Sequence, residues 1–584
     1  MKSIYSKIFV CLLFLVILLP QGVKADERSE HFVLVSNESP VSSGTEQSGM
    51  LQDRRLLNRS VRYAAAKKQM DLTSKQVFRV GQVKKFWVYN LNSGTSKRIT
   101  ATLRYQGAHT LVWVRGGGMS AGKATELGQT FDATIYPMDV TLFGPPTNHA
   151  RSQRVNILCY PIDDGAGTDG GLASGYFDPD DLTGAAEANH AEVLYVDTSQ
   201  GDDDSQLTGM ETTLAHEFQH LINFSQRVLI TKHQEMATWL NEGLAMAAEQ
   251  AYSGHALTDR IDYYNTDSDI SEGLSLTQWS GSTDTLGNYS LAYLFVQYLR
   301  IQCGQGTAIY KQLIDQKSGG SLAVQALIQR YIDPSLTFGR FMTDFRIALY
   351  LNEPAGLYGF HNEPGFTQLR QRILDSAYSS RALGGGSAFI ARMNNSSVPV
   401  TKGVDVVWIN LSNAAGDFTP PDAPAVLPLT DHETVLSGSA EAGSTVTITD
   451  GLTLLAQTKI DQTGSFSVNL PLQKAGSRLY AYAEDTAGNV GLSRIVTVLD
   501  RTPPVRAIIS RVSFRKHVIC GQAEAKAVVT AYRNRHRIGQ TLVTKKGRFT
   551  LYLKKSLLAG QAVTVYVTDQ AGNRSAPCHV TMKR

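Results

Sequence analysis

The sequence predicts a multidomain protein in which a small β-domain precedes an α+β domain and two similar β-sandwiches follow. Three observations support this. The 584 residues exceed what one hydrophobic core holds, since single cores stop growing at about 250 to 300 residues. Apolar residues alternate with a period of two up to about residue 142, and later take helical spacing, as over 289–299. Beyond residue 416, one sequence pattern occurs twice.

The N-terminus has the features of an export signal. Lys2 and Lys7 precede an apolar stretch over 8–19, and Ala25 is among the small residues at the expected cleavage position. The stretch is shorter than the roughly 20 apolar residues that cross a bilayer. We therefore predict a signal peptide over 1–25, no transmembrane anchor and a secreted, extracellular product. Residues 26–75 are polar and uneven, which suits either a propeptide or a linker.

Residues 76–150 are expected to form the small β-domain. Alternating apolar residues over 85–89, 99–103 and 110–114 indicate strands, with Gly, Asn and Ser turns between them. Region 151–415 begins with strands and becomes helical, and it is the candidate catalytic domain.

Charge and cysteine content exclude some functions. The net charge of +4 is small against 56 basic and 52 acidic side chains, so whole-chain charge gives no case for nucleic acid or a membrane surface. Four cysteines follow the signal peptide, too few for a disulfide-built scaffold. Cys159 is interpreted as a buried strand thiol, whereas Cys520 and Cys578 lie in one C-terminal unit and could form a single bridge.

Units 416–502 and 503–584 repeat each other. Asp485-Thr486-Ala487-Gly488-Asn489 returns 84 residues later as Asp569-Gln570-Ala571-Gly572-Asn573. Short alternating strands with such turns predict β-sandwiches and resemble bacterial immunoglobulin-like modules. Two roles stay open for these modules, a spacer without a ligand and a binder of a cell-surface or matrix ligand.

One pentad in the α+β region has the spacing of a metal site. In His216-Glu217-Phe218-Gln219-His220 the histidines are four residues apart, which on a helix puts both imidazoles on one face. Apolar residues at helical spacing predict that helix, and Thr208-Gly209-Met210-Glu211 has the capping-box pattern for its start. Such a pentad also arises by chance, so a third ligand is needed.

Glu242 is the candidate third ligand. It lies 22 residues after His220 in a second stretch with helical spacing, which allows a turn and an antiparallel return. Two histidines and one carboxylate leave a fourth position for water, as in catalytic rather than structural zinc sites. The alternative is that Glu242 is a solvated helix charge or a cap.

The string His-Glu-Phe-Gln-His-Leu-Ile-Asn from His216 and the string Trp-Leu-Asn-Glu-Gly from Trp239 resemble the hyicolysin family, in the gluzincin branch of zinc metallopeptidases. The resemblance covers residues 154–351. It implies an α+β zincin catalytic domain with one catalytic zinc ion, and an exported neutral endopeptidase that acts on proteins or peptides. The second string is also similar to zinc aminopeptidases, but their Gly-Ala-Met-Glu-Asn string is not found. An aminopeptidase, and a surface-binding protein with a degenerate peptidase domain, remain the alternatives.

The same resemblance suggests roles for individual residues. Glu217 would accept a proton from zinc-bound water and later deliver one to the leaving amine. Tyr289 is the candidate donor to the developing oxyanion, with Tyr252, His233 and His255 as rivals.

Two further expectations concern the surroundings of the metal helix. The strand over 192–197 is expected to be the sheet edge that holds an extended substrate. Acidic loops at 163–164, 178–181 and 202–204 are candidates for calcium, but none has the ligand spacing of a calcium loop, so solvated loops are favoured.

Overall fold

The computed structural model describes residues 31–39, 77–91, 93–147, 154–162, 174–183, 185–279, 285–375, 383–393, 402–513, 516–554 and 557–581. The predicted signal peptide over 1–25 lies outside the described residues, and of the segment over 26–75 only residues 31–39 are described. Within the described part of the chain, no helix is both long and apolar enough to cross a membrane.

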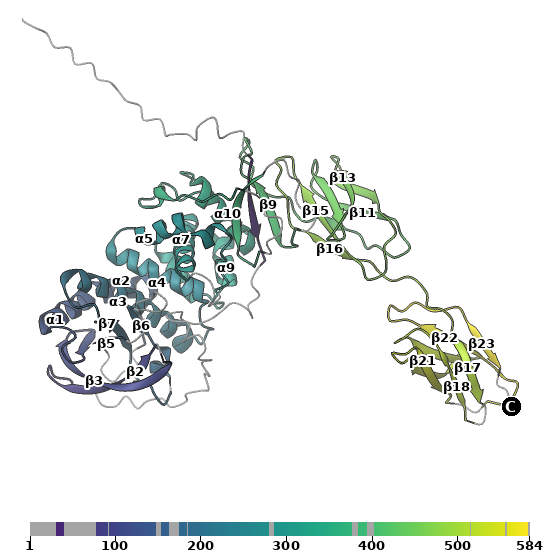
Figure 1. The fold of residues 1–584 in the computed structure, drawn as a ribbon, viewed down its shortest axis with the longest axis horizontal. Helices are drawn as coiled ribbons and strands as arrows, with labels where there is room; N and C mark the ends of the chain where they lie inside the picture. Colours follow the sequence, from purple (N-terminus) through teal and green to yellow (C-terminus); the bar gives the residue numbers. More distant parts are fainter. Residues whose placement is uncertain are drawn as a thin grey trace, which may run out of the picture.

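A six-stranded mixed sheet forms the first half of the peptidase region (Figure 1). Its order is β2-β3-β4-β5-β7-β6, where only the β4–β5 and β5–β7 pairs are parallel. The strands are β2 Val83–Asn90, β3 Thr95–Gln106, β4 Thr110–Val114, β5 Val155–Tyr160, β6 Gly175–Phe177 and β7 Val193–Asp197. The predicted β region over 76–150 therefore shares one sheet with the strands that follow it.

Residues 121–143, which we expected to continue the strands of the β-domain, form helices instead. These are α1 Ala121–Thr130, the π-helix η2 Phe131–Ile135 and α2 Tyr136–Phe143. The Ser120 side chain caps α1 by accepting from the Lys123 amide. Ala124, Leu127, Phe131 and Ile135 then recur at helical spacing and are fully buried in the core against the sheet.

The expectation that 192–197 is the edge of the sheet is wrong. Strand β7 lies between β5 and β6, and the edge strand is the three-residue β6, antiparallel to β7. The reason is the return of the chain between β5 and β7, which adds β6 outside β7. A three-residue strand is too short to be found from alternation.

Helices build the second half of the peptidase region. The longest, α3 Asp204–Phe224, continues into the π-helix η4 Ser225–Ile230 and packs against α4 Thr238–Ser253, which in turn packs against α7 Thr285–Cys303. The others are α5 Thr258–Thr266, α6 Ser268–Ser271, α8 Ala308–Asp315, α9 Ser321–Tyr331, α10 Phe338–Leu351 and η5 Phe366–Gln368, whereas the short 3₁₀ helix η3 Pro179–Leu182 lies earlier, between β6 and β7.

Helix α3 begins earlier than its sequence predicts. Asp203 is the N-cap and its side chain accepts from the Gln206 amide. The predicted capping box from Thr208 therefore lies inside the helix, where the Thr208 hydroxyl donates to the Asp204 carbonyl instead. Asp203 at the N-cap and Asp204 in the first turn both carry negative charge near the positive end of the helix dipole, which favours a helix start there over one at Thr208.

A second, three-stranded sheet joins the two ends of the peptidase region. Its central strand is β1 His31–Asn37, which pairs antiparallel with β8 Ala388–Met393 on one side and β9 Val406–Asn410 on the other. One face of this sheet packs on α10 through Leu34, Ile390 and Ile409, and Phe418 is buried in the same hydrophobic cluster. The other face, with Val33, Val35 and Trp408, packs on Tyr482 and Val490 of the first C-terminal module.

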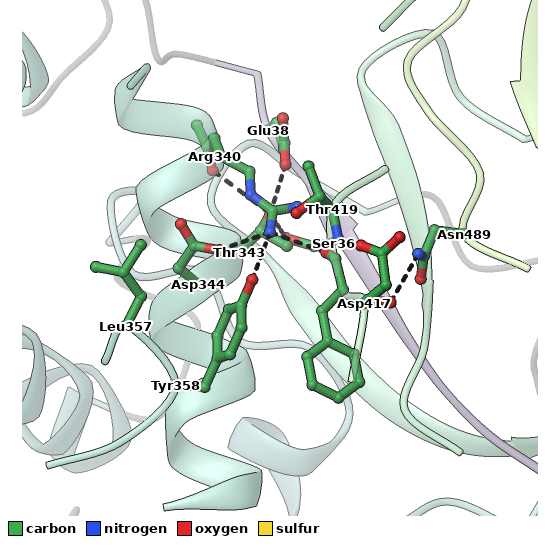
Figure 2. A network of polar contacts seen from close by, with 12 residues as sticks. Ser36, Glu38, Arg340, Thr343, Asp344, Leu357, Tyr358, Asp417, Thr419 and Asn489 are labelled. Atoms are coloured by element: carbon green, nitrogen blue, oxygen red, sulfur yellow. Dashed lines mark hydrogen bonds and ion pairs between the residues drawn. The ribbon is translucent and has the colours of Figure 1, made fainter. Parts of the chain in front are cut away.

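Polar contacts strengthen this junction (Figure 2). Arg340 of α10 pairs with Asp344 at 2.8 Å, and it donates to the Phe418 carbonyl at 2.8 Å. The Thr343 hydroxyl lies 2.8 Å from Glu38, just after β1. Figure 2 shows these groups converging from β1, α10 and the segment that enters the first module. The N-terminal strand, the peptidase helices and the first module thus form one packed unit.

Each C-terminal unit is a sandwich of a three-stranded and a four-stranded sheet. In the first, β10-β11-β14 faces β13-β12-β15-β16, with bounds β10 Ala425–Val426, β11 Val435–Ser439, β12 Thr445–Thr449, β13 Leu454–Lys459, β14 Ser465–Asn469, β15 Arg478–Glu484 and β16 Arg494–Thr497. In the second, β17-β18-β21 faces β20-β19-β22-β23, with bounds β17 Ile508–Ser513, β18 Val518–Gln522, β19 Val528–Arg533, β20 His536–Leu542, β21 Arg548–Tyr552, β22 Ala562–Thr568 and β23 Cys578–Thr581.

The cysteines behave only partly as the sequence suggests. Cys159 is fully buried in β5, as predicted. The bridge considered for Cys520 and Cys578 is not formed, and both are free thiols. The physical reason is their direction, since Ile519 points into the core and the neighbouring Cys520 points outward to the Thr550 hydroxyl at 3.9 Å, whereas Cys578 packs against the core.

Candidate metal centre

The two histidines of the pentad lie one turn apart on α3. Their ring centroids are 4.7 Å apart and the ring planes are nearly perpendicular, at 82°. The opposite side of the helix is anchored by Leu214, Phe218 and Leu221, each fully buried in the main core. The helix therefore has little freedom to rotate, and the two imidazoles stay directed toward α4.

Glu242 comes from α4 and meets both histidines. Its Oε2 lies 3.3 Å from His216 Nε2 and 3.5 Å from His220 Nε2, and the Glu242 side chain is fully buried. The next residue, Gly243, permits close packing of α4 on α7, because a Cβ there would lie 2.5 Å from Val296 Cγ2 and 2.8 Å from the Ala292 carbonyl oxygen. The glycine of Trp-Leu-Asn-Glu-Gly thus helps to set the depth of Glu242.

The spacing and burial of these atoms fit a zinc ion. Ligand atoms of His216, His220 and Glu242 all lie within 4.8 Å of one another, the one such cluster among the described residues. Donors about 2.0 to 2.1 Å from a tetrahedral ion are about 3.3 Å apart, close to the two His–Glu distances. Moreover, the His220 ring is 1% exposed, its Nδ1 has no hydrogen-bond partner among the described residues, and its Nε2 meets Glu242 only at a long 3.5 Å, which is costly for a buried imidazole without an ion.

The electrostatics of the cluster favour an ionised carboxylate. Burial alone would raise the pKa of Glu242, but the charge of His220 and hydrogen bonds from both histidines lower it to about 2. Burial likewise opposes protonation of His216, yet hydrogen bonds to Glu242 and Glu249 hold its pKa well above the ordinary value. In the protein alone, a proton on His216 thus helps to balance the Glu242 carboxylate, and a divalent cation can replace that proton.

Glu249 was not predicted from the sequence. It lies two turns after Glu242 on α4, and its Oε1 accepts from His216 Nδ1 at 2.6 Å. This hydrogen bond fixes the tautomer, so that His216 Nε2 keeps its lone pair for the metal side of the ring. The signal that could have found it is the seven-residue spacing from Glu242, which returns to nearly the same helix face.

Glu217 is buried beside the cluster, at 3% exposure, and the edge strand β6 passes next to it. A Cβ built on Gly175 of β6 would lie 3.6 Å from Glu217 Cγ and 2.6 Å from Thr213 Cγ2. Only glycine fits this approach, so the edge strand and the candidate base are held in contact.

Tyr289 of α7 lies close to the same carboxylates. Burial raises its pKa well above the ordinary value, and the charges of Glu242 and Glu217 and a hydrogen bond to Glu242 raise it further, while Arg260 lowers it. The ring packs edge-on against Trp279 at 5.3 Å, and the Arg260 guanidinium lies 5.6 Å from its centroid. The hydroxyl is therefore a neutral donor within the site.

The rivals of Tyr289 have other contacts. The Tyr252 hydroxyl donates to Glu211 at 2.7 Å, and His255 Nδ1 lies 3.1 Å from the Ala256 carbonyl on an exposed loop. His233 is half-buried in the loop after η4, where its amide donates to the Arg227 carbonyl. Glu242 and Glu217 are among the groups that raise the pKa of Tyr289, which favours Tyr289 over these rivals.

The acidic loops have structural uses where they are described. Asp202 accepts from the Ser120 amide, Asp203 caps α3 and Asp204 pairs with Lys123. Asp178 caps η3, and buried Asp181 accepts from the Tyr195 hydroxyl and the Asn189 amide. None of these loops forms a metal-like cluster within the described residues, and 163–164 lies outside them.

Comparison with known proteins identifies two kinds of unit in the chain. The Peptidase M30 family profile matches residues 140–371, and the bacterial Ig domain profile matches 420–500 and 504–583. The predicted multidomain architecture, with a hyicolysin-type peptidase followed by two immunoglobulin-like modules, is thereby confirmed.

Among individual proteins, a metalloprotease agrees with the peptidase profile. The neutral metalloprotease ShpI of Staphylococcus hyicus is 38% identical over 296 residues, which cover 50% of this chain and 68% of that protein. The cell wall-associated protease of Bacillus subtilis is 26% identical over 157 residues, 27% of this chain and 17% of its own. A solved structure of fibronectin(III)-like modules of Clostridium thermocellum CbhA is 16% identical over 28% of this chain and 93% of its own, with a TM-score of 0.18.

Proposed function

The chain belongs to the peptidase M30 family of metalloproteases, and we propose that it is a secreted zinc endopeptidase that hydrolyses internal peptide bonds of extracellular proteins. The observation that carries the proposal is the cluster of His216, His220 and Glu242 from two neighbouring helices, with Glu217 buried beside it.

The three residues of the cluster would hold the ion, with His220 and Glu242 fully buried and His216 oriented by Glu249. When bound, zinc supplies Lewis acidity, which acidifies water and polarises a peptide carbonyl. Three protein ligands leave one position for these groups, the composition of catalytic rather than structural zinc sites.

Glu217 performs the proton transfers in this proposal. A carboxylate next to the ion accepts a proton as water attacks the carbonyl and delivers it to the leaving amine, whose basicity would otherwise prevent departure. Its near-complete burial strengthens this exchange because little bulk water competes for the proton. The Tyr289 hydroxyl, kept neutral by burial and by nearby carboxylates, donates to the oxygen where negative charge develops.

The outer edge of β6 is the proposed binding place for the substrate. One side of this strand pairs with β7, and no strand of the described residues pairs with the other side, so an extended peptide could add there by backbone hydrogen bonds. Backbone pairing accepts any sequence and engages residues on both sides of the cut bond, which supports internal cleavage. The proximity of Gly175 to Glu217 brings such a peptide to the candidate base.

The test is a purified full-length Glu217→Gln variant, with Glu126→Gln on the exposed side of α1 as control. Glu217→Gln is expected to cleave casein about 100- to 10,000-fold more slowly while it keeps one zinc per chain by elemental analysis. Glu126→Gln should cleave casein as fast as the unmodified protein does. A chelator should abolish the activity of the unmodified protein and of Glu126→Gln.

Two results would refute parts of the proposal. Full activity of Glu217→Gln removes Glu217 as base. Mass spectrometry of the casein digest separates the reactions, since internal fragments are expected, and release of single N-terminal residues alone would identify an aminopeptidase instead.

A further inference from the structure

The second immunoglobulin-like module has a charge that the whole-chain value hides. Residues 503–584 contain 16 Lys or Arg and only two Asp or Glu, so the module carries +14 while the chain carries +4. The first module, 416–502, contains five basic and ten acidic residues. Two modules of one fold thus differ by 19 charges, which points to different partners.

The two modules also differ on one equivalent face, the outer face of the four-stranded sheet. In the first module this face is covered, because Tyr482 and Val490 pack on β1 and β9, and Val490 exchanges backbone hydrogen bonds with Trp408. An offset of 84 residues places Tyr566 and Arg574 at the matching positions of the second module. Arg574 is exposed there, and Figure 1 shows this module lying away from the peptidase region.

The exposed face of the second module is cationic, and we call its residues Tyr532, Arg537, Tyr566, Arg574 and His579 the basic face. Strand pairing sets Arg537 opposite Tyr532 on β19 and β20. The Arg574 guanidinium lies 3.4 Å from the Tyr566 centroid and 5.0 Å from that of Tyr532. Both rings hold the arginine over the sheet and leave its N–H groups directed to solvent or a ligand.

More cations surround the basic face. The β19–β20 turn carries Arg533 and Arg535, next to Arg537. Arg535 and Arg537 are exposed. Among the ion pairs of the described residues, none joins Arg533, Arg535 or Arg537 to a carboxylate. Several unneutralised guanidinium groups on one sheet end form a binding site for closely spaced anions.

We propose that the basic face binds a linear cell-wall polymer of phosphodiester-linked polyols. Guanidinium groups match phosphate oxygens in two-point hydrogen bonds, and a repeating phosphodiester chain presents them at short intervals. Single-stranded nucleic acid is disfavoured because Arg574 already covers the Tyr566 ring, and the two tyrosine rings stand edge to face at 81°, so neither offers a clear platform for a base.

Such binding would keep a released peptidase at the cell wall. It depends only on the second module, so it stands or falls independently of the zinc chemistry. The first module is an unsuitable substitute, since its equivalent face is occupied by the sheet of β1, β8 and β9.

The experiment uses the full chain and purified poly(glycerol phosphate) immobilised on a sensor, at 50 and 200 mM salt. The test variant combines Arg533→Gln, Arg537→Gln and Arg574→Gln. The matched control combines Arg506→Gln, Arg511→Gln and Arg548→Gln, which removes the same charge from exposed positions outside the basic face, two of them on the three-stranded sheet. Casein cleavage and the melting temperature report whether each protein is folded.

The unmodified protein is expected to bind, and to lose affinity steeply as salt rises, because bound phosphates release their counterions. The test variant should bind at least tenfold more weakly with a flatter salt dependence, and the control within threefold. If the triple variant does not fold, Arg574→Gln alone should weaken binding at least threefold.

Three results would overturn the proposal: no binding by the unmodified protein, equal losses in test and control variants, or binding at least tenfold tighter to heparin or duplex DNA of the same charge concentration. Equal losses would mean that net charge, not the basic face, holds the polymer. Tighter binding to heparin or DNA would name another polymer class as the partner.

Discussion

Replacing Glu249 with Gln should weaken zinc binding without removing a ligand. Glu249 Oε1 accepts from His216 Nδ1 at 2.6 Å, and the two side chains are only 16% and 12% exposed, so water replaces this contact poorly. Hydrogen bonds to a charged group contribute about 1.5 to 3 kcal/mol. Glutamine keeps the size of the side chain and an acceptor oxygen but not the negative charge. Glu249→Gln should therefore lose most of this hydrogen-bond energy.

The expected consequence is a zinc dissociation constant about 10- to 100-fold higher, which corresponds to about 1.4 to 2.7 kcal/mol. Glu249→Ala should lie at the upper end because no acceptor remains to select the His216 tautomer. Competition with a chromogenic chelator measures the constant directly. At saturating zinc, kcat should recover to within a few fold, since Glu249 does not touch the substrate in this arrangement.

Glu126→Gln, which removes one exposed carboxylate from α1, is the charge-matched control. An unchanged zinc affinity in Glu249→Gln and Glu249→Ala would refute the reasoning, because it would mean that the His216–Glu249 hydrogen bond contributes nothing to the metal site. Weakening that is equal in Glu126→Gln would assign the effect to overall charge instead.

Other parts of the structure give three further predictions. Tyr289→Phe should lower kcat for casein about 100- to 1000-fold with little change in KM. The control is Tyr252→Phe, which removes a hydroxyl that donates to Glu211 and should change kcat by no more than a few fold. Equal losses in the two variants would remove Tyr289 as the donor. Phe418→Ala should lower the free energy of unfolding by about 3 to 5 kcal/mol in a denaturant titration, because Phe418 is 5% exposed in the core under β1. The control is Arg501→Ala, at the matching exposed position of the second repeat, which should lower it by less than about 0.5 kcal/mol. N-terminal sequencing of the secreted protein should find a start at or before His31, and a start near residue 76 would contradict the role of β1 as a central strand.

Local sequence patterns predicted the cluster of the candidate metal centre because most of its parts are local. Helical spacing alone places His216 and His220 together, and Glu242 follows in the next long helix. Glu249 was missed because an acidic residue near the end of a helix is usually solvated, and only the packing of α4 on α3 brings it to His216. Tyr289 depended on resemblance, since its approach to Glu242 requires the crossing of α7 over α4.

The elements that the sequence could not predict are those fixed by distant partners. Strand β6 has three residues and no alternation, and its edge position follows from how the chain returns to β7. Residues 31–37 lie in a segment that is polar as a whole, and their apolar run over 32–35 is too short to identify a strand whose partners lie more than 350 residues away. The charge of the second module escaped notice because the acidic remainder of the chain cancels most of it.

If the protein is secreted as proposed, the position of β1 sets the order in which it can fold during export. Val33 pairs with Asn410, so the three-stranded sheet cannot close until nearly the whole peptidase region has left the membrane. Closing so long a loop is slow and costs chain entropy that only the finished core offsets. A chain held midway in the export channel would therefore lack this sheet beside α10, and β1 would be among the last strands to pair, although it lies near the start of the sequence.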